Sequence, residues 1–433
     1  MRAAEISDLN KEGLTMGYTE NLIDFIGKST DCYHAVKTAK DRLDENDFTE
    51  LLEGDKWDVQ SGGKYYVIRN SSSIIAFEMP KKDFGAFMIC ASHTDSPSFK
   101  LKPDFEINAD GCIKLSVEGY GGMIMSSWLD RPLSISGRIV TAKNGKVETK
   151  LVNIDRDLLV IPSLAIHMSR DINKGYEFNI RRDMCPIASD KNGRIEDIIA
   201  ENVGVDKEEI LGFDLSLYNR MRGTVLGADG EYFSAPRIDD LQCMYSTLEG
   251  FLNSESDDNV TVFAAFDNEE VGSGTKQGAK SSFLRDVLER ICNNSETYKR
   301  AVAKSFMLSC DNAHAVHPNF ADKSDGTNRV YMNGGIVIKY NANQRYTTDA
   351  VSEAVVKYVC KNAGVPYQMY ANRSDIPGGS TLGNLSNEKV SLNTADIGLA
   401  QLAMHSSYET AGSRDTEYMV KMIKEFYKTE IVL

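Results

Sequence analysis

The sequence predicts an α/β protein with a mixed, mostly parallel central sheet, helices on both faces of that sheet, and an inserted β-rich domain. Apolar runs of strand length alternate with segments of helical periodicity in the first and last parts of the chain, which favours a covered parallel sheet. From about Ser98 to Tyr232, short segments instead alternate between polar and apolar residues and are separated by turns that contain Gly or Asn. We therefore expect an α/β domain formed by residues 1–97 and 233–433, with residues 98–232 inserted as a second domain.

The N-terminal part of the α/β domain begins with a helical segment. Residues 22–52 mix helix-forming residues with spaced apolar ones, and strand-like runs follow at 64–68 and 73–77. The next run, 86–91, is continuously apolar, as expected of a strand that is buried on both faces, and it stops at His93.

The inserted domain and the C-terminal part differ in their periodicity. In the insertion, residues 113–117 and 133–140 alternate as half-buried strands do, and residues 195–202 predict a helix. Strands and helices alternate again after it, and Gly364 is a suitable stop for the third of the helices. The predicted helices are 241–252, 283–291, 351–360 and 418–426, and the predicted strands are 260–266, 306–308 and 336–338.

Composition and charge exclude several classes of partner. The chain has 63 acidic and 49 basic residues and a formal net charge of −14, so it repels phosphate backbones and we expect no nucleic-acid partner. No apolar stretch approaches the roughly 20 residues needed to span a bilayer, and the first residues lack the apolar core of a secretory signal. The eight cysteines form no CxxC pair. These features predict a cytoplasmic protein without a membrane partner or a cysteine-based zinc site.

Polar side chains follow three of the predicted buried strands, at the point where each strand ends. His93 and Asp95 follow the first of these strands, the sequence Asp-Asn-Glu-Glu at 267–270 follows the second, and Asp311 follows the third. In open α/β sheets, ligands bind beyond the carboxyl ends of the strands, so these clusters are expected to converge.

The residue types in these clusters suit a pair of divalent metal ions. Imidazole nitrogen and carboxylate oxygen are ligands for Zn, and also for Mn or Co. Two ions about 3.5–4 Å apart need a shared carboxylate, which either Asp239 or Asp240 could supply, and His405 could complete the set. Taken singly, each residue also has a structural interpretation: a hydrogen-bonded His93, a solvated Glu269–Glu270 pair, or Asp311 as a helix N-cap.

A nucleotide-binding loop is the main alternative. The chain contains no HExxH, GxSxG or Walker A sequence, but the loop from Gly272 to Gly278 follows a predicted strand and precedes a predicted helix. Its glycines follow GxGxxxG spacing, and two glutamates stand directly before it, where they would face a phosphate. A nucleotide-binding protein is therefore the weaker alternative function.

Seven segments together resemble one known family. They are ASHTDSP at 91–97, PRIDDL at 236–241, FDNEEVGS at 266–273, DNAHAVHPN at 311–319, NGG at 333–335, NANQRY at 341–346 and QLAMHS at 401–406. In type and order they resemble the motifs of the aspartyl aminopeptidase family of dinuclear zinc metallopeptidases, and the likeness extends from about residue 20 to the C-terminus.

The resemblance implies a role for each site residue. Asp239 would bridge the two ions, Glu269 would be the general base, and Asp95 would orient the ring of His93. The implied metal ligands are His93, Asp239, Glu270, Asp311 and His405.

The resemblance also implies an assembly and a substrate. The family's inserted domain mediates assembly, typically into a dodecamer, and His167 matches a histidine that reaches a neighbour's active site. Lys339 is our candidate for binding an acidic N-terminal side chain, with a solvated strand end as its alternative. We thus expect a cytoplasmic homo-oligomeric metallo-aminopeptidase that cleaves peptides with a free N-terminus and prefers N-terminal Asp or Glu. A catalytically inactive assembly scaffold is a further alternative.

Overall fold

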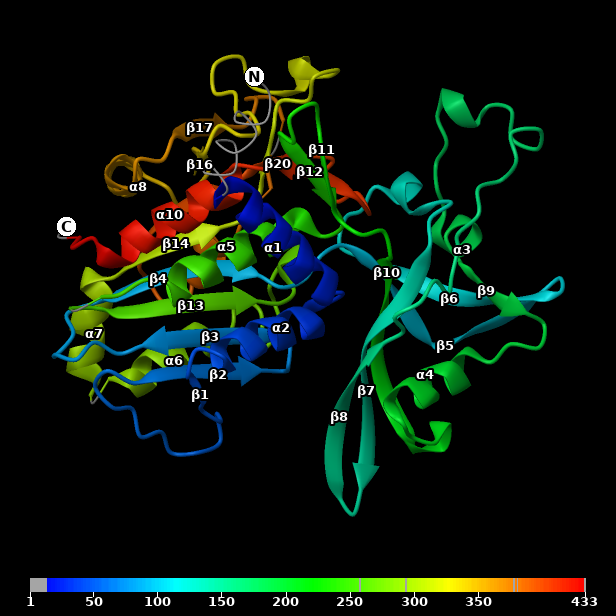
Figure 1. Cartoon of the computed structure of the whole chain (residues 1–433), viewed down its shortest axis with the longest axis horizontal. Coiled ribbons are helices and arrows are strands. Elements are labelled where there is room, and N and C mark those ends of the chain that lie inside the picture. The colour runs from blue at the N-terminus through cyan, green and yellow to red at the C-terminus, as the bar shows by residue number, and fades with distance from the viewer. Residues whose placement is uncertain (1–13, 257, 293, 377, 380, 432–433) are drawn as a thin grey trace, which may run out of the picture.

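The central sheet confirms the predicted α/β class. The computed structural model describes residues 14–431 apart from 257, 293, 377 and 380, and nine strands of this part form one sheet in the order β1-β2-β3-β13-β4-β14-β18-β16-β17 (Figure 1). The pairs β1–β2, β13–β4, β4–β14, β14–β18 and β16–β17 are parallel, whereas β2–β3, β3–β13 and β18–β16 are antiparallel. The sheet is therefore mixed and mostly parallel.

The strands of this sheet come from both ends of the chain. In chain order they are β1 (Thr49–Glu50), β2 (Lys64–Arg69), β3 (Ser73–Glu78), β4 (Phe87–His93), β13 (Val260–Phe266), β14 (Phe306–Cys310), β16 (Ile336–Tyr340), β17 (Tyr367–Ala371) and β18 (Asn393–Gly398).

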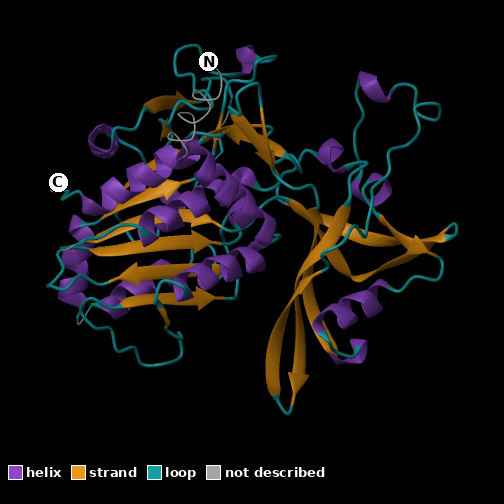
Figure 2. Ribbon diagram, viewed as in Figure 1, coloured by secondary structure: helices purple, strands orange, loops and turns teal. Residues whose placement is uncertain are grey.

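Helices cover both faces of the sheet (Figure 2). Along β13, Phe263 and Ala265 belong to one hydrophobic core, and Val262 and Ala264 belong to another, because successive side chains of a strand point to opposite faces. The first core is shared with α1 (Leu14–Lys28), α2 (Cys32–Asp44), α5 (Ile238–Leu252), α8 (Ala350–Ala363) and α10 (Asp415–Lys428), and the second with α6 (Phe283–Ile291), α7 (Ser295–Lys304) and α9 (Leu382–Ser386).

Local sequence signals determine where α8 begins and ends. The Asp349 carboxylate accepts hydrogen bonds from the backbone N–H groups of Val351 and Ser352 and caps the first turn. Gly364 adopts the left-handed conformation with φ of 65°, which closes the last turn. The predicted stop at Gly364 is therefore confirmed.

A second sheet stands beside the first, on the right in Figure 1. Among the described residues its strand order is β8-β7-β10-β5-β6-β9, and its own hydrophobic core includes Ile195 and Ile199 of α4. Its strands lie within the predicted insertion, although the exact domain boundaries stay a prediction. The elements of this module are β5 (Ser98–Ala109), β6 (Cys112–Tyr120), β7 (Leu133–Lys143), β8 (Lys146–Asn153), α3 (Ile180–Asp183), β9 (Ile187–Asp190), α4 (Ile195–Val203) and β10 (Ile210–Asn219).

A third, smaller sheet joins distant segments near one edge of the central sheet, and the sequence did not predict it. The antiparallel pairing of β12 with β20 aligns Ala235 with Glu409, which brings the segment before α5 next to the loop that contains His405. Its strands are β11 (Thr224–Leu226), β12 (Tyr232–Ala235), β15 (Ala313–His314), β19 (Ala400–Leu402) and β20 (Glu409–Gly412).

No helix in the part of the chain that the structure describes combines the length and the apolar composition needed to cross a bilayer. All eight cysteines are free thiols.

Candidate metal centre

The three predicted clusters meet at the carboxyl edge of the central sheet. His93 is the last residue of β4, Asp311 follows β14, and the 3₁₀ turn η5 (Glu269–Val271) follows β13. Because β4 lies between β13 and β14 and is parallel to both, the ends of these three strands are adjacent. The first turn of α5 adds Asp239 and Asp240, and the loop between β19 and β20 adds His405.

Asp239 lies at the centre of this arrangement. Its Oδ1 is 3.3 Å from His93 Nε2, and its Oδ2 is 3.6 Å from His405 Nε2. His405 Nε2 is in turn 3.4 Å from Glu270 Oε2. One carboxylate therefore faces two imidazole rings, which is the arrangement needed to bridge two ions.

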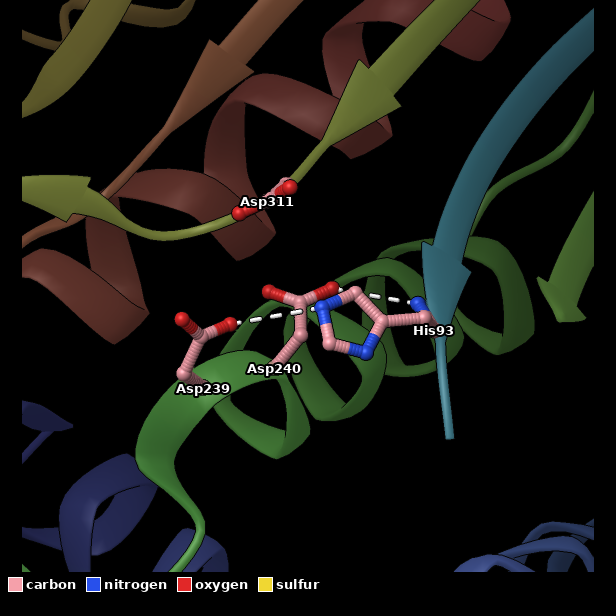
Figure 3. Close-up of side chains that lie close together, drawn as sticks. All are labelled: His93, Asp239, Asp240 and Asp311. Atoms are coloured by element: carbon pink, nitrogen blue, oxygen red, sulfur yellow. Dashed lines mark hydrogen bonds and ion pairs between the residues drawn. The ribbon is translucent and has the colours of Figure 1, made fainter. Parts of the chain in front are cut away.

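The potential ligand atoms form three groups, each with its atoms within 4.8 Å of one another. Asp239 belongs to two of these groups. Figure 3 shows the group that consists of His93, Asp239, Asp240 and Asp311. The groups are His93, Asp239, Asp240 and Asp311; His93, Glu269 and Glu270; and Asp239, Glu270 and His405.

Asp240 has a different set of partners from Asp239. Its two oxygens accept hydrogen bonds from the backbone N–H groups of His93, at 3.1 Å, and of Asn312, at 3.2 Å. It is fully buried, and this burial raises the pKa of its carboxyl well above the usual range. Asp240 therefore ties together the ends of β4 and β14, whereas the carboxylate of Asp239 faces both histidines.

The donor set fits divalent metal ions. Asp239 Oδ1 and Glu270 Oε1 are buried and have no hydrogen-bond donor. Leaving a buried carboxylate oxygen without a partner is costly, and a cation between these oxygens and the two imidazole nitrogens would remove that cost. The nitrogen and oxygen ligands suit zinc, and manganese or cobalt are the alternatives.

The electrostatics of the centre reflect a concentration of buried carboxylates. Burial raises the pKa of the Glu269 carboxyl to about 8, an effect that Asp311 increases and the His93 ring opposes. Burial disfavours the charged ring of His405, but the carboxylates of Asp239 and Glu270 outweigh burial and raise its pKa to about 10. A divalent cation acts in the opposite direction on all of these groups.

Two of the structural interpretations left open by the sequence are wrong. Glu269 and Glu270 are not a solvated pair, because both are partly buried. Their side chains line a pocket, here called the metal pocket, together with His93, Asp239, Asp311 and His405. Asp311 is not a helix N-cap, since it lies between β14 and β15.

Asp95, to which the resemblance assigns the orienting of His93, contacts the His93 ring in the structure. His93 Nδ1 is 3.0 Å from the Asp95 backbone oxygen and 3.4 Å from its Oδ1. The Asp95 carboxylate also accepts hydrogen bonds from the backbone N–H groups of Glu269, at 3.1 Å, and Glu270, at 3.2 Å. One side chain thus contacts both the His93 ring and the turn that carries the two glutamates.

Lys339 lies in the same pocket and is only 3% exposed, so the alternative of a solvated strand end is wrong. Its Nζ donates a hydrogen bond to the Asn312 backbone oxygen at 2.8 Å and lies 3.4 Å from Asp311 Oδ1. Tyr346 and Thr381 line the same cavity, which has a volume of about 140 Å³.

His167 is exposed on a loop of the inserted module. It is not among the described residues that line the metal pocket of its own chain. Its neighbours Leu164, Ile166 and Met168 are 54%, 48% and 77% exposed.

Sequence reasoning missed Glu409, which supports two predicted ligands. Its Oε2 accepts a hydrogen bond from the Asp239 N–H at 3.1 Å, and its Oε1 accepts one from the His405 N–H at 2.7 Å. The pairing of β12 with β20 brings Glu409 to this position. No local pattern indicates such a contact, because the pairing joins segments that are far apart in the chain.

The Gly272–Gly278 loop, on which the nucleotide-binding alternative rests, folds back on itself. A Cβ atom at Gly278 would lie 2.4 Å from the Ser273 backbone oxygen. Ser273 N donates a hydrogen bond to Asn268 O at 2.7 Å. The glycine at 278 is therefore explained by closure of the loop, without a phosphate.

Comparisons with known proteins point to one family. Residues 25–427 match the family described as aminopeptidase I zinc metalloprotease (M18). The chain is 45% identical to a probable M18 family aminopeptidase 2 of Clostridium acetobutylicum, over 95% of this chain and 98% of the relative.

Solved structures agree with this match. The chain is similar to Ape4 in its complex with Nbr1, with a TM-score of 0.93 and 34% identity over 96% of this chain and 86% of the other. It is also similar to the S. cerevisiae mApe1 dodecamer, with a TM-score of 0.83 and 29% identity over 94% of this chain and 96% of the other.

Proposed function

The chain belongs to the aminopeptidase I (M18) family of zinc metalloproteases and is a zinc-dependent aminopeptidase, and on this premise we propose that it hydrolyses peptides with a two-metal centre. The observation that carries the proposal is the position of Asp239, whose two oxygens face His93 and His405. One ion would be held by His93, Asp239 and Asp311, and the other by Asp239, Glu270 and His405.

The chemistry divides between the ions and the side chains around them. When bound, two divalent ions polarise the peptide carbonyl and acidify water. The Glu269 carboxylate, which lines the pocket, accepts a proton from the attacking water and delivers it to the leaving amine. The water oxygen first forms the new C–O bond, and the C–N bond then breaks as the leaving amine takes up the proton, so that one water is consumed per peptide bond. Asp95 keeps the His93 ring in place through Nδ1.

Lys339 supports a preference for N-terminal Asp or Glu. Its buried ammonium lines the metal pocket and is 3.4 Å from Asp311 Oδ1. A metal ion at Asp311 would satisfy that carboxylate and leave the Lys339 charge available to a substrate carboxylate. A neutral side chain would leave this buried charge without a partner, which is the physical basis for discrimination.

The inserted module supports assembly into a homo-oligomer. Leu164, Ile166 and Met168 expose apolar surface around His167, and one similar solved structure is a dodecamer. His167 would reach the metal pocket of a neighbouring subunit and stabilise the oxyanion that forms during hydrolysis. A cytoplasmic location stays a prediction from the sequence.

The test is metal analysis combined with a panel of aminoacyl substrates that differ in their N-terminal residue. We expect two ions per protomer, cleavage of the first residue only, and the highest kcat/KM for Asp or Glu. A single ion at full activity would contradict the two-metal proposal. Metal binding without turnover would indicate an inactive scaffold, and binding of ATP or NAD without metal would favour the nucleotide-binding alternative.

A further inference from the structure

We propose that residues 120–127 of the inserted module, here called the positioning segment, hold metal ligands of their own chain in place. The segment begins at Tyr120, the last residue of β6, and extends into the 3₁₀ turn η2 (Met125–Trp128). This inference rests on the proposed ligand set and gives the inserted module a role in metal binding that is separate from assembly.

Tyr120 contacts the residue behind His93. Its hydroxyl donates a hydrogen bond to Asp95 Oδ2 at 2.5 Å and accepts one from Asn268 Nδ2 at 2.9 Å. Asp95 in turn lies 3.4 Å from His93 Nδ1 through its other oxygen. Removing the Tyr120 hydroxyl would therefore take away one of the two hydrogen bonds to Asp95 Oδ2, and the bond from the Glu270 N–H would remain.

Gly122 determines which nitrogen of His405 faces the metal centre. His405 Nδ1 is 2.6 Å from the Gly122 backbone oxygen, which can only accept a hydrogen bond. The proton of a neutral His405 ring is therefore on Nδ1, and the lone pair on Nε2 is directed toward Asp239 and Glu270.

The backbone around His405 is held by the same segment. Ile124 N donates a hydrogen bond to His405 O at 3.0 Å, and Ser407 N donates one to Ser127 Oγ at 2.8 Å. These bonds fix the main chain at His405 and just beyond it, so that the ring and its backbone both depend on the inserted module.

Gly121 lets the segment approach Glu270 closely. Its φ of +71° lies in the left-handed region, and a Cβ atom there would be 3.1 Å from Glu270 Cβ and 3.5 Å from Glu270 Oε2. The positioning segment therefore touches Glu270 and His405 directly and reaches His93 through Asp95. Losing one such outer contact typically costs about 10–100-fold in metal affinity.

The first experiment compares Tyr120→Phe with Tyr218→Phe in the full-length protein. Tyr218 is a buried tyrosine of the same module, and its hydroxyl bonds to Asn153 Oδ1 at 2.8 Å, to the Ile154 backbone oxygen and to Arg220, none of which is a proposed ligand. Zinc affinity is measured by competition with a chelator of known affinity, and the oligomeric mass is measured in parallel. We expect Tyr120→Phe to bind zinc more weakly, by about 10-fold, at the low end of the range for direct partners of a ligand because Tyr120 acts through Asp95, with unchanged mass, and Tyr218→Phe to bind like the wild type.

Wild-type affinity in Tyr120→Phe, or an equal loss in both variants, would overturn the inference. A wild-type protein that fails to bind zinc would instead overturn the proposed function, so the two failures are distinguishable.

The second experiment uses Gly121→Ala, with Gly145→Ala as its control. Gly145 has a similar φ of +77°, but a Cβ atom there meets nothing within 4 Å, so the control has the same backbone strain without the contact to Glu270. We expect only Gly121→Ala to lose zinc affinity. Equal zinc affinities in the two variants would contradict the inference that the close approach of Gly121 holds Glu270 in place.

Discussion

Glu269 and Glu270 are neighbours in the chain, but we predict that they have different duties. Replacing Glu269 by Gln keeps the shape of the side chain and removes the proton acceptor. General acid–base catalysis contributes about 10²–10⁴ in rate. Glu269→Gln should therefore lose this factor in kcat, which corresponds to about 2.7–5.4 kcal/mol in the barrier, and it should keep both ions.

Glu270→Gln should instead weaken the binding of a metal ion. Glu270 Oε2 lies 3.4 Å from His405 Nε2, and its Oε1 is a buried oxygen without a hydrogen-bond donor. Loss of an outer partner already costs about 10–100-fold in metal affinity, or about 1.4–2.7 kcal/mol, and loss of a direct ligand should cost at least as much. Activity of Glu270→Gln should therefore return when zinc is added in excess.

The assay measures bound metal after dialysis and turnover across a zinc titration. Glu296→Gln, at an exposed position of α7, serves as the control. Equal metal loss in Glu269→Gln and Glu270→Gln, or recovery of Glu269→Gln by added zinc, would refute the division of roles.

Three further predictions concern substrate, assembly and stability. Lys339→Met should lower the ratio of kcat/KM for N-terminal Asp over Leu, whereas an unchanged ratio would exclude Lys339 from side-chain recognition. Co-expression of His167→Ala with Glu269→Ala should restore part of the activity that each variant lacks, and mixed oligomers as inactive as the single variants would contradict donation of His167 between subunits. Removal of metal by a chelator should lower the unfolding midpoint measured by calorimetry, since zinc at about 1,000 times its Kd stabilises by about 4 kcal/mol per site. An unchanged midpoint would show that the ions do not stabilise the fold.

Strands buried on both faces could be predicted closely. The predicted strand 260–266 has the same bounds as β13, because its side chains alternate between two hydrophobic cores and all of its residues except Thr261 are apolar. The predicted helix 283–291 likewise has the bounds of α6, whose apolar residues recur at helical spacing along its buried face.

Other elements had no comparable signal. Within the described residues α7 buries only Ala301, so this helix carries few of the apolar residues on which a prediction from sequence depends. β15 and β19 are two and three residues long and pair Ala313 with Ala400. A short strand carries too few residues for a pattern, and its partner is distant in the chain, so the third sheet could not be predicted locally.

The metal centre likewise contains residues that local sequence patterns predict and residues that they do not. His93, Glu270 and Asp311 could be predicted as a group because each follows its own buried strand, and the ends of neighbouring parallel strands meet. The sequence could not distinguish Asp239 from Asp240 by local chemistry, because the two residues are adjacent and identical. Their different orientations depend on packing against His93 and His405.

The supporting contacts were also beyond the reach of a sequence pattern. The bond from His405 to the Gly122 backbone oxygen joins residues 283 positions apart. A backbone carbonyl is present at every residue, so no residue type marks it as a partner. Residue types and strand ends were therefore enough to propose His93, Glu270 and Asp311 as candidate ligands, and the family resemblance assigned Asp239 and His405 as the others. The orientation of all five side chains depends on long-range contacts that form only when the inserted module folds against the central sheet.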